Sequence, residues 1–296
     1  MKTIGFVGTG TMGKGMVQNL LKNNFAVKAY NRTKQRLEGL QHANLTIVDS
    51  PQEAATGVDI VFTIVTNDAA VEEVMLGEKG MLQDIAAGTV VVDSSTTSIE
   101  LTEKIAAVCK EKNVEFLDAP VTGSKTGAET GTLMFMIGGK EEVFEKARPV
   151  FEAMGKKLVY CGESTYGQRV KIALNLTQAL VFQSYLEGIM LAVKNGVPLA
   201  IMKDVLDNSG AKSNVATGKM PSLLKRDFTP HFMVKLMHKD MNLAKKEMEK
   251  LNLPLPLSSQ ILSVFEKAME KELAEKDWSA IVEVIEEQAG IQLREA

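Results

Sequence analysis

Short apolar runs alternate with amphipathic segments through about the first 160 residues. The apolar runs predict strands, because stretches of this length rich in Val, Ile and Phe suit a sheet that is buried on both faces. They lie at 4–7, 25–30, 58–65, 89–93, 114–120, 133–139 and 157–160. Amphipathic segments, such as the one around 101–110, predict helices. This alternation predicts a doubly wound sheet that binds ligands at the carboxyl ends of its strands.

From Gly167 onward the pattern is helical only. Helices are predicted at 168–193, 199–208, 232–251, 258–275 and 279–289, separated by Pro198, Pro221, Pro230, Pro254 and Pro256. We therefore expect an α/β fold in which a Rossmann-type doubly wound sheet is followed by an all-α domain. The expected boundaries are 1–163 for the nucleotide-binding domain and 164–296 for the helical domain, which would serve substrate binding and oligomerisation.

A glycine-rich motif follows the first predicted strand. Gly8-Thr9-Gly10-Thr11-Met12-Gly13 fits the pattern G-x-G-x-x-G, and a helix and a second strand follow it. Gly8 permits a tight turn, Gly10 lets the backbone approach a pyrophosphate, and Gly13 lets the helix pack closely on the strand. The helix N-terminus supplies N–H donors and a positive dipole for phosphates. We predict that these residues bind a dinucleotide; the plain alternative is an ordinary tight turn.

The end of the second predicted strand indicates which dinucleotide. NAD-specific folds usually place a carboxylate there, which accepts from the ribose 2′-hydroxyl. This chain instead has Asn31-Arg32-Thr33. A guanidinium pairs with a 2′-phosphate through charged hydrogen bonds, whereas an acid would repel it. The segment therefore favours NADP (NADPH) as the cofactor, with an idle surface charge at Arg32 as the alternative.

Composition narrows the class of protein. Hydrophobic residues make up 45% and charged residues 24%, the net charge is −3, and no basic run suggests a nucleic-acid surface. Cys109 and Cys161 have no metal-binding spacing, and the three histidines add none, so no metal is expected. The apolar start is interrupted by glycine and lacks a charged flank and a cleavage site, so we expect no signal peptide. No uninterrupted apolar stretch reaches the roughly 18 residues of a membrane span. We expect a cytoplasmic enzyme that binds neither nucleic acid nor membrane.

The first helix of the predicted helical domain carries polar groups on one face. Lys171, Asn175 and Gln178 lie at i, i+4 and i+7 among apolar residues. Buried polar groups need partners, and ligand sites form where domains meet, so a site role is favoured over a solvated stripe. Hydride transfer to an aldehyde or ketone leaves an alkoxide that must receive a proton. A desolvated lysine suits that acid–base work, and Asn175 could orient it.

Four stretches together resemble the β-hydroxyacid dehydrogenase family. They are the run from Gly5 to Gly13, the segment Asp118-Ala119-Pro120-Val121-Thr122-Gly123-Ser124, the spacing of Gly167, Lys171 and Asn175, and the run Lys239-Asp240-Met241-Asn242-Leu243-Ala244. The family includes 3-hydroxyisobutyrate dehydrogenases, tartronate semialdehyde reductases and glyoxylate/succinic semialdehyde reductases. The matches follow the family's order from residue 4 to 244, which argues against a chance match.

The resemblance implies roles for the matched residues. Lys171 would be the catalytic acid/base with Asn175 beside it, and Thr122, Gly123 and Ser124 would hold the substrate carboxylate. Lys239 would reach toward the cofactor, while Val65, Thr66 and Thr96 would lie near the nicotinamide. The resemblance also implies a homodimer or homotetramer. Each role has a plain alternative: an ordinary turn at Thr122–Ser124, an exposed charge pair at Lys239-Asp240, and a helix cap at Thr96.

The predicted function is NADPH-dependent reduction of a small aldehyde- or keto-acid, of the glyoxylate or succinic semialdehyde type, with Lys171 as general acid. Thr122 stands where the family has serine, and Gly123-Ser124-Lys125 is similar to the glyoxylate and succinic semialdehyde reductases. A 3-hydroxyisobutyrate-type dehydrogenase, oxidising a β-hydroxy acid, is the alternative within the class. An alternative of a different class is a non-catalytic NADP-binding module.

Overall fold

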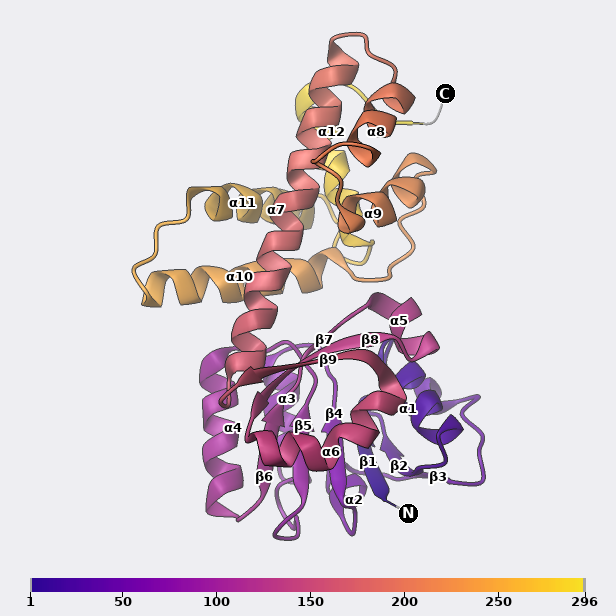
Figure 1. The fold of residues 1–296 in the computed structure, drawn as a ribbon, viewed down its shortest axis with the longest axis vertical. Helices are drawn as coiled ribbons and strands as arrows, with labels where there is room; N and C mark the ends of the chain where they lie inside the picture. The colour runs from indigo at the N-terminus through magenta and orange to yellow at the C-terminus, as the bar shows by residue number, and fades with distance from the viewer. Residues whose placement is uncertain (1, 295–296) are drawn as a thin grey trace. The chain divides into compact units, whose positions relative to one another are not determined.

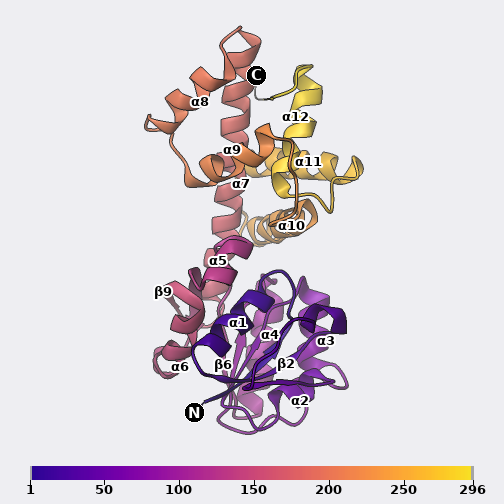
Figure 2. The same cartoon turned by 90° about the vertical axis from the view of Figure 1, so that its right-hand side faces the viewer.

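The computed structural model describes residues 2–294. The chain forms two compact units, one running through Lys171 and one from Ile172 onward. The first unit is a sheet with helices on both faces, and the second unit contains helices (Figures 1 and 2). The predicted α/β fold, with a doubly wound sheet followed by an all-α region, is therefore confirmed.

The first unit is built on a nine-stranded sheet with the order β3-β2-β1-β4-β5-β6-β8-β7, and β9 pairs with β8. The strands are β1 (Thr3–Val7), β2 (Ala26–Tyr30), β3 (Leu45–Ile47), β4 (Ile60–Thr63), β5 (Val90–Asp93), β6 (Glu115–Asp118), β7 (Val121–Thr122), β8 (Leu133–Gly139) and β9 (Gly155–Gly162). The neighbouring strands β3, β2, β1, β4, β5 and β6 are all parallel. Strand β8 runs antiparallel to β6 and β7. The strand order reverses direction at β1 and β4, which is where such sheets bind ligands.

Two hydrophobic cores cover the two faces of this sheet. Because side chains alternate along a strand, Phe6 and Phe62 contribute to one core and Val7 and Val61 to the other. The helices of the unit are η1 (Lys34–Leu37), α1 (Gly13–Lys22), α2 (Pro51–Ala55), α3 (Asp68–Leu76), α4 (Ile99–Glu111), α5 (Ser124–Thr130) and α6 (Glu141–Met154). Residues of α1 and α6 pack in the first core, and residues of α2, α3 and α4 in the second.

The second unit is all-α. Its elements are the greater part of α7 (Tyr166–Lys194), then α8 (Leu199–Asp207), α9 (Asn214–Leu224), α10 (Val234–Lys250), α11 (Pro256–Glu270), η2 (Trp278–Ile281) and α12 (Val282–Ala289). Phe182, Phe265 and Trp278 lie in its core, where the rings of Phe182 and Trp278 meet edge to face with centroids 5.0 Å apart.

The prediction that Pro221 separates two helices is wrong. Pro221 lies inside α9, where its carbonyl still accepts a hydrogen bond from the N–H of Lys225 at 3.3 Å. A proline inside a helix costs about 3 kcal/mol. Met220, Leu223 and Leu224 are buried around it, and burial of each such side chain contributes about 1.5–3 kcal/mol. Tertiary packing therefore outweighs the local preference at this position.

Asp277 fixes the segment that leads into α10. Its carboxylate is buried, contacts the Lys219 ammonium at 2.7 Å, and accepts hydrogen bonds from the backbone N–H groups of His231 and Phe232. Burial by itself would raise the pKa of this carboxyl, but the charge and hydrogen bonds of Lys219 hold that pKa below its usual value. The start of α10 is thus anchored by an ionised carboxylate.

Helix α7 is long and apolar enough to cross a membrane by length and composition. A core helix of a protein without a membrane passes the same test, because its buried face must also be apolar. Phe182, Leu186 and Ile189 of α7 are fully buried in the core of the second unit. Composition alone therefore does not make α7 a membrane span.

Candidate active site

The glycine-rich motif forms a tight turn at the carboxyl end of β1. Gly8 has a φ of +100°, and a Cβ at this position would lie 2.2 Å from the carbonyl oxygen of Ile64. A Cβ at Gly13, the first residue of α1, would lie 1.9 Å from the carbonyl oxygen of Gly8. Neither position can hold a side chain without displacing backbone. The turn therefore has the close packing of helix on strand that the motif predicts.

The residues of this turn suit a dinucleotide. No side chain caps the first turn of α1, whose N-cap position is Met12. The start of a helix leaves backbone N–H groups that can donate to an anion. The buried hydroxyl of Thr9 has no hydrogen-bond partner among the described residues. Gly10 is partly exposed and Thr11 is exposed. A phosphate would provide acceptors for these donors, and thus the cofactor fits.

Asn31 joins this turn to the end of β2. Its side-chain oxygen accepts a hydrogen bond from the N–H of Thr9 at 2.9 Å, and its amide nitrogen donates to the carbonyl of Thr33 at 2.8 Å. Arg32 and Thr33 are exposed beside it. Asn31 thus positions the segment rather than offering a carboxylate to a ribose.

Arg36 is a cation that the sequence reasoning missed. Its Nη1 atom lies 3.0 Å from the point where a Cβ on Gly10 would be, so the guanidinium lies over the glycine turn. It is carried there by the short helix η1, which begins directly after Thr33. The sequence shows Arg36 as a second arginine one helical turn after Arg32. That Arg36 lies close to Gly10 depends on the fold, so the sequence alone does not reveal it.

Two strand ends beside the turn hold the residues predicted near the nicotinamide. Val65 and Thr66 follow β4, and Thr96 follows β5. The Ser95 hydroxyl accepts a hydrogen bond from the N–H of Val65 at 3.0 Å, which joins the two ends. Ser98, not Thr96, caps α4, because its hydroxyl accepts from the N–H of Leu101. The alternative that Thr96 caps this helix is therefore wrong.

The predicted substrate loop connects β7 to α5. Thr122 ends β7 and is half-buried, while Gly123 and Ser124 are exposed. Gly123 has a φ of +134° and Ser124 a φ of +57°. A left-handed serine is uncommon and costs energy, and such residues gather at functional sites. The loop is thus held in a conformation more constrained than an ordinary turn requires.

The first turn of α7 is fixed to the ends of β6 and β8. The buried Asp118 carboxylate accepts hydrogen bonds from the N–H groups of Thr165 at 2.7 Å and Gln168 at 2.8 Å. A Cβ at Gly167 would lie 2.4 Å from the carbonyl oxygen of Met136. Burial raises the pKa of Asp118 to about 7, although these hydrogen bonds act to lower it. Asp118 and Gly167 therefore set where the helix starts, a role that sequence reasoning did not give them.

Lys171 and Asn175 follow on α7, and both are buried. Lys171, the last residue of the first unit, is 7% exposed. In the second unit, the Asn175 amide donates to the Asp240 carboxylate at 2.6 Å, and the Lys239 ammonium contacts the same carboxylate at 2.9 Å. Asp240 is fully buried, so the exposed charge pair offered as the alternative for Lys239-Asp240 is wrong. Asp240 is a further functional candidate. It lies in the matched run from Lys239 to Ala244, but the sequence alone assigned it no role.

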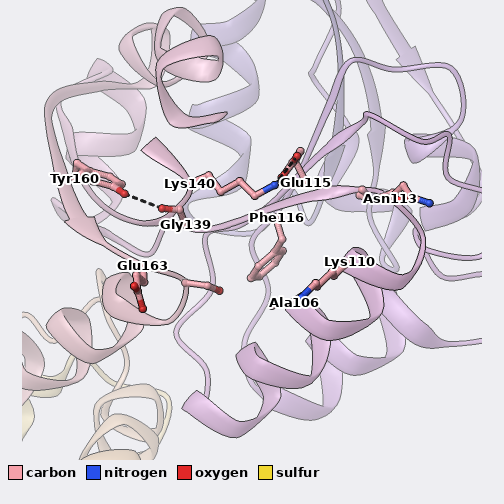
Figure 3. Close-up of a pocket in the computed structure, with 11 residues that line it drawn as sticks. Ala106, Lys110, Asn113, Glu115, Phe116, Gly139, Lys140, Tyr160 and Glu163 are labelled. Carbon is pink, nitrogen blue, oxygen red and sulfur yellow. Dashed lines mark hydrogen bonds and ion pairs between the residues drawn. The ribbon is translucent and has the colours of Figure 1, made fainter. Parts of the chain in front are cut away.

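A hollow elsewhere in the first unit has a volume of about 610 Å³. Its rim includes the ion pair of Lys140 with Glu115 and the hydrogen bond from the Tyr160 hydroxyl to the Gly139 carbonyl, both 2.9 Å long (Figure 3). None of its lining residues is a predicted site residue. The chemistry predicted from the motifs therefore lies outside this hollow. Within residues 2–294, no three His, Cys, Asp or Glu residues are placed to hold a metal ion.

Comparison with known proteins places the chain in a family. Residues 3–162 match the model for the NAD binding domain of 6-phosphogluconate dehydrogenase, and residues 165–285 match that for the NAD-binding region of NADP-dependent 3-hydroxyisobutyrate dehydrogenase. The chain is 36% identical to 2-(hydroxymethyl)glutarate dehydrogenase of Eubacterium barkeri, over 98% of this chain and 97% of that protein. It is 31% identical to glyoxylate/succinic semialdehyde reductase 1 of Arabidopsis thaliana, over 95% of this chain and 98% of that protein.

A solved structure agrees with these relatives. The 3-hydroxyisobutyrate dehydrogenase of Mycobacterium tuberculosis, solved with L-serine, superposes with a TM-score of 0.88 and is 29% identical, over 96% of this chain and 99% of that one. These relatives favour an enzyme over a non-catalytic module. The chain is an NAD(P)-binding oxidoreductase acting on CH–OH groups, and it belongs to the β-hydroxyacid dehydrogenase family.

Proposed function

We propose that the protein reduces a small aldehyde- or keto-acid, of the glyoxylate or succinic semialdehyde type, to the hydroxy acid. NADPH, when bound, supplies the hydride that the carbonyl carbon receives. Lys171 donates the proton that the carbonyl oxygen then needs, and Asn175, one helical turn further along α7, orients the lysine. The observation that carries the proposal is the buried Lys171 on a helix whose first turn is fixed to the strand ends.

The substrate's acid group is assigned to the loop at Thr122, Gly123 and Ser124. A carboxylate accepts hydrogen bonds from hydroxyls and from backbone N–H groups, and this loop offers both. The constrained backbone at Gly123 and Ser124 supports a binding role. Ser124 supports the reductase type, because Gly123-Ser124-Lys125 resembles the glyoxylate and succinic semialdehyde reductases rather than the Gly-Gly of the 3-hydroxyisobutyrate dehydrogenases.

The preference for NADPH is supported by two arginines and one amide. Asn31 brings no negative charge to the end of β2, and Arg32 is exposed beside it. Arg36 adds a second guanidinium over the glycine turn. Two guanidinium groups and no carboxylate suit a 2′-phosphate, which carries negative charge and several acceptor oxygens.

The alternative is a dehydrogenase that oxidises a β-hydroxy acid of the 3-hydroxyisobutyrate type. It is supported by the names of the Eubacterium barkeri and Mycobacterium tuberculosis relatives. In this direction Lys171 would accept the proton of the substrate hydroxyl. The same residues would act in reduction and in oxidation. The two functions are therefore distinguished by which substrate and which cofactor the enzyme prefers.

We also propose that the protein is a homodimer or homotetramer that associates through its second unit. Ile201 and Val205 lie one turn apart on α8 and are 56% and 53% exposed, and Leu191 on α7 is 68% exposed. A second copy of the chain would remove these apolar side chains from water, which contributes about 25 cal/mol for each Å² buried.

The substrate is tested by steady-state rates with glyoxylate, succinic semialdehyde and 3-hydroxyisobutyrate, each with both cofactors. We expect the highest kcat/KM for glyoxylate or succinic semialdehyde with NADPH. The physical reason is the pair of hydroxyls in the substrate loop and the arginines beside the cofactor turn. A higher kcat/KM for 3-hydroxyisobutyrate with NAD would establish the alternative.

The role of Lys171 is tested by Lys171→Ala. Turnover should fall at least about 10²-fold, as for the loss of a general acid, while NADPH affinity measured by fluorescence titration stays within about threefold. Lys194→Ala, at the exposed end of the same helix, is the matched control and should keep the wild-type rate. An unchanged rate in Lys171→Ala would remove the lysine from the mechanism.

The arginines are tested by Arg32→Ala, Arg36→Ala and the double variant. Each single change should raise the KM for NADPH about tenfold, since a hydrogen bond to a charged group contributes about 1.5–3 kcal/mol. The KM for NADH should change far less, because NADH lacks the 2′-phosphate. Arg148→Ala, whose guanidinium pairs with Glu145, is the control. Equal losses for both cofactors would show that the arginines do not read the 2′-phosphate.

Association is tested by light scattering during size-exclusion chromatography. The wild type should elute as a dimer or tetramer of the 32.2 kDa chain. The double change Ile201→Asp and Val205→Asp should reduce its mass to that of one chain, because burying a carboxylate at an interface is unfavourable. Leu257→Asp, an exposed residue of α11, should leave the assembly intact. A wild type that elutes as a single chain would contradict the proposal.

A further inference from the structure

Gln168 occupies an unusual position in the first turn of α7. Its side chain is fully buried. Its amide nitrogen donates to the carbonyl of Ser95 at 2.8 Å, and its amide oxygen accepts from the N–H of Thr97 at 3.3 Å. The two bonds therefore hold the backbone on both sides of Thr96. The same residue stands three positions before Lys171.

The amide of Gln168 satisfies both partners at once. The Ser95 carbonyl needs a donor and the Thr97 N–H needs an acceptor, and a glutamine side chain offers one of each. An ionised glutamate would set a negative oxygen against the Ser95 carbonyl. Methionine has similar length but makes neither bond, so it would leave both backbone groups without partners in a buried place. The residue type at position 168 is thus determined by the loop that it contacts.

The loop held by Gln168 is itself fixed to neighbouring strand ends. The Ser95 hydroxyl accepts from the N–H of Val65 after β4, and the Ser95 N–H donates to the Asp93 carboxylate at the end of β5. Asp118, at the end of β6, accepts the backbone N–H of Gln168. Backbone and side chain of Gln168 therefore connect the start of α7 to β4, β5 and β6.

We propose that Gln168 is a positioning residue, which fixes the Thr96 loop relative to the turn of α7 that leads to Lys171. This inference rests on the proposed function, in which Lys171 donates the proton, and on the position near the nicotinamide that the family resemblance implies for Thr96. Hydride and proton must reach adjacent atoms of one carbonyl group, so the two donors must share one rigid frame. A misplacement of about 1 Å can reduce a rate about 10²-fold. Gln168 supplies that frame without contacting the substrate.

The first test compares Gln168→Met with Ser98→Ala. Ser98 caps α4, and the loss of this cap destabilises the helix while both side-chain bonds of Gln168 stay in place. We expect Gln168→Met to lower kcat about 10- to 100-fold, with NADPH affinity within about threefold and a larger primary deuterium isotope effect on kcat from NADPH deuterated at the transferred position. Ser98→Ala should lower the melting temperature while keeping turnover and isotope effect.

The second test uses Gln168→Glu as a rescue that depends on pH. A protonated carboxyl can donate to the Ser95 carbonyl and accept from the Thr97 N–H, as the amide does, whereas the ionised form cannot. Asp118 accepts the N–H of residue 168, and Asp93 accepts the N–H of Ser95. These two carboxylates favour the protonated form of a glutamate at position 168, whereas the ammonium of Lys171, three residues on, favours its ionised form. The turnover of Gln168→Glu relative to wild type should therefore rise as the pH falls, while the ratio for Gln168→Met stays constant.

The outcomes separate this inference from the function on which it rests. If Gln168→Met and Ser98→Ala lose turnover equally at equal loss of melting temperature, Gln168 has only a structural role and the inference is overturned. A flat pH dependence of the Gln168→Glu ratio overturns it as well. If Lys171→Ala keeps its activity, the proposed function fails, whatever the result at Gln168.

Discussion

The position of the first turn of α7 against the strand ends of the sheet is the constraint on which the rest of the site depends. Asp118 holds this turn by accepting two of its backbone N–H groups, which at a helix start have no partner within the helix. A carboxylate also interacts favourably with the positive end of the helix dipole. Gly167 completes the contact, because its lack of a side chain lets the helix backbone approach the carbonyl of Met136. Few alternative placements of the helix satisfy both requirements.

This anchor explains how a long apolar helix carries a buried lysine. Burial of polar groups is tolerated where their surroundings supply partners, and the buried polar residues of α7, namely Gln168, Lys171 and Asn175, lie in its first third. Further along, Phe182, Leu186 and Ile189 enter the core of the second unit. The start of α7 is thus hydrogen-bonded to a strand end of the sheet, and the later part of the helix packs in the hydrophobic core of the second unit. Asn175 lies early in the second unit and is held by the buried carboxylate of Asp240.

The sequence predicted those parts of the fold that depend on local pattern. Apolar runs located most of the strands, and helical periodicity located α7, α8, α10 and α12. Strand direction is not a local property, so the antiparallel β8 could not be read from its composition. The strand β3 is only three residues long and largely exposed, so its pattern is too short to reveal it. Helix α9 continues through Pro221 because tertiary packing compensates for the proline. The predicted helix over 258–275 ends at Glu270, and residues after it form turns.

The candidate site was predictable where a motif carries its own geometry. The glycine turn at Gly8 and Gly13 is such a case, because steric limits act between neighbouring residues. The partners of Asp118 and Gln168 lie about 50 and 70 positions away along the chain, and no spacing rule links them. Arg36 was missed for the same reason, since its approach to Gly10 depends on the path of η1.

In the proposed function, the positions fixed by contacts distant in sequence and the positions fixed by local backbone geometry have different tasks. Backbone groups and buried side chains at Asp118, Gly167 and Gln168 fix where the helix bearing Lys171 begins, and none of them needs to contact a substrate. The loop at Gly123 and Ser124 is exposed and is constrained chiefly by its own backbone conformation. In the proposed function, a change in that loop would alter which side chains meet a substrate while the start of α7 keeps its hydrogen bonds. Reaction type and substrate choice would then be set by different residues of the same unit.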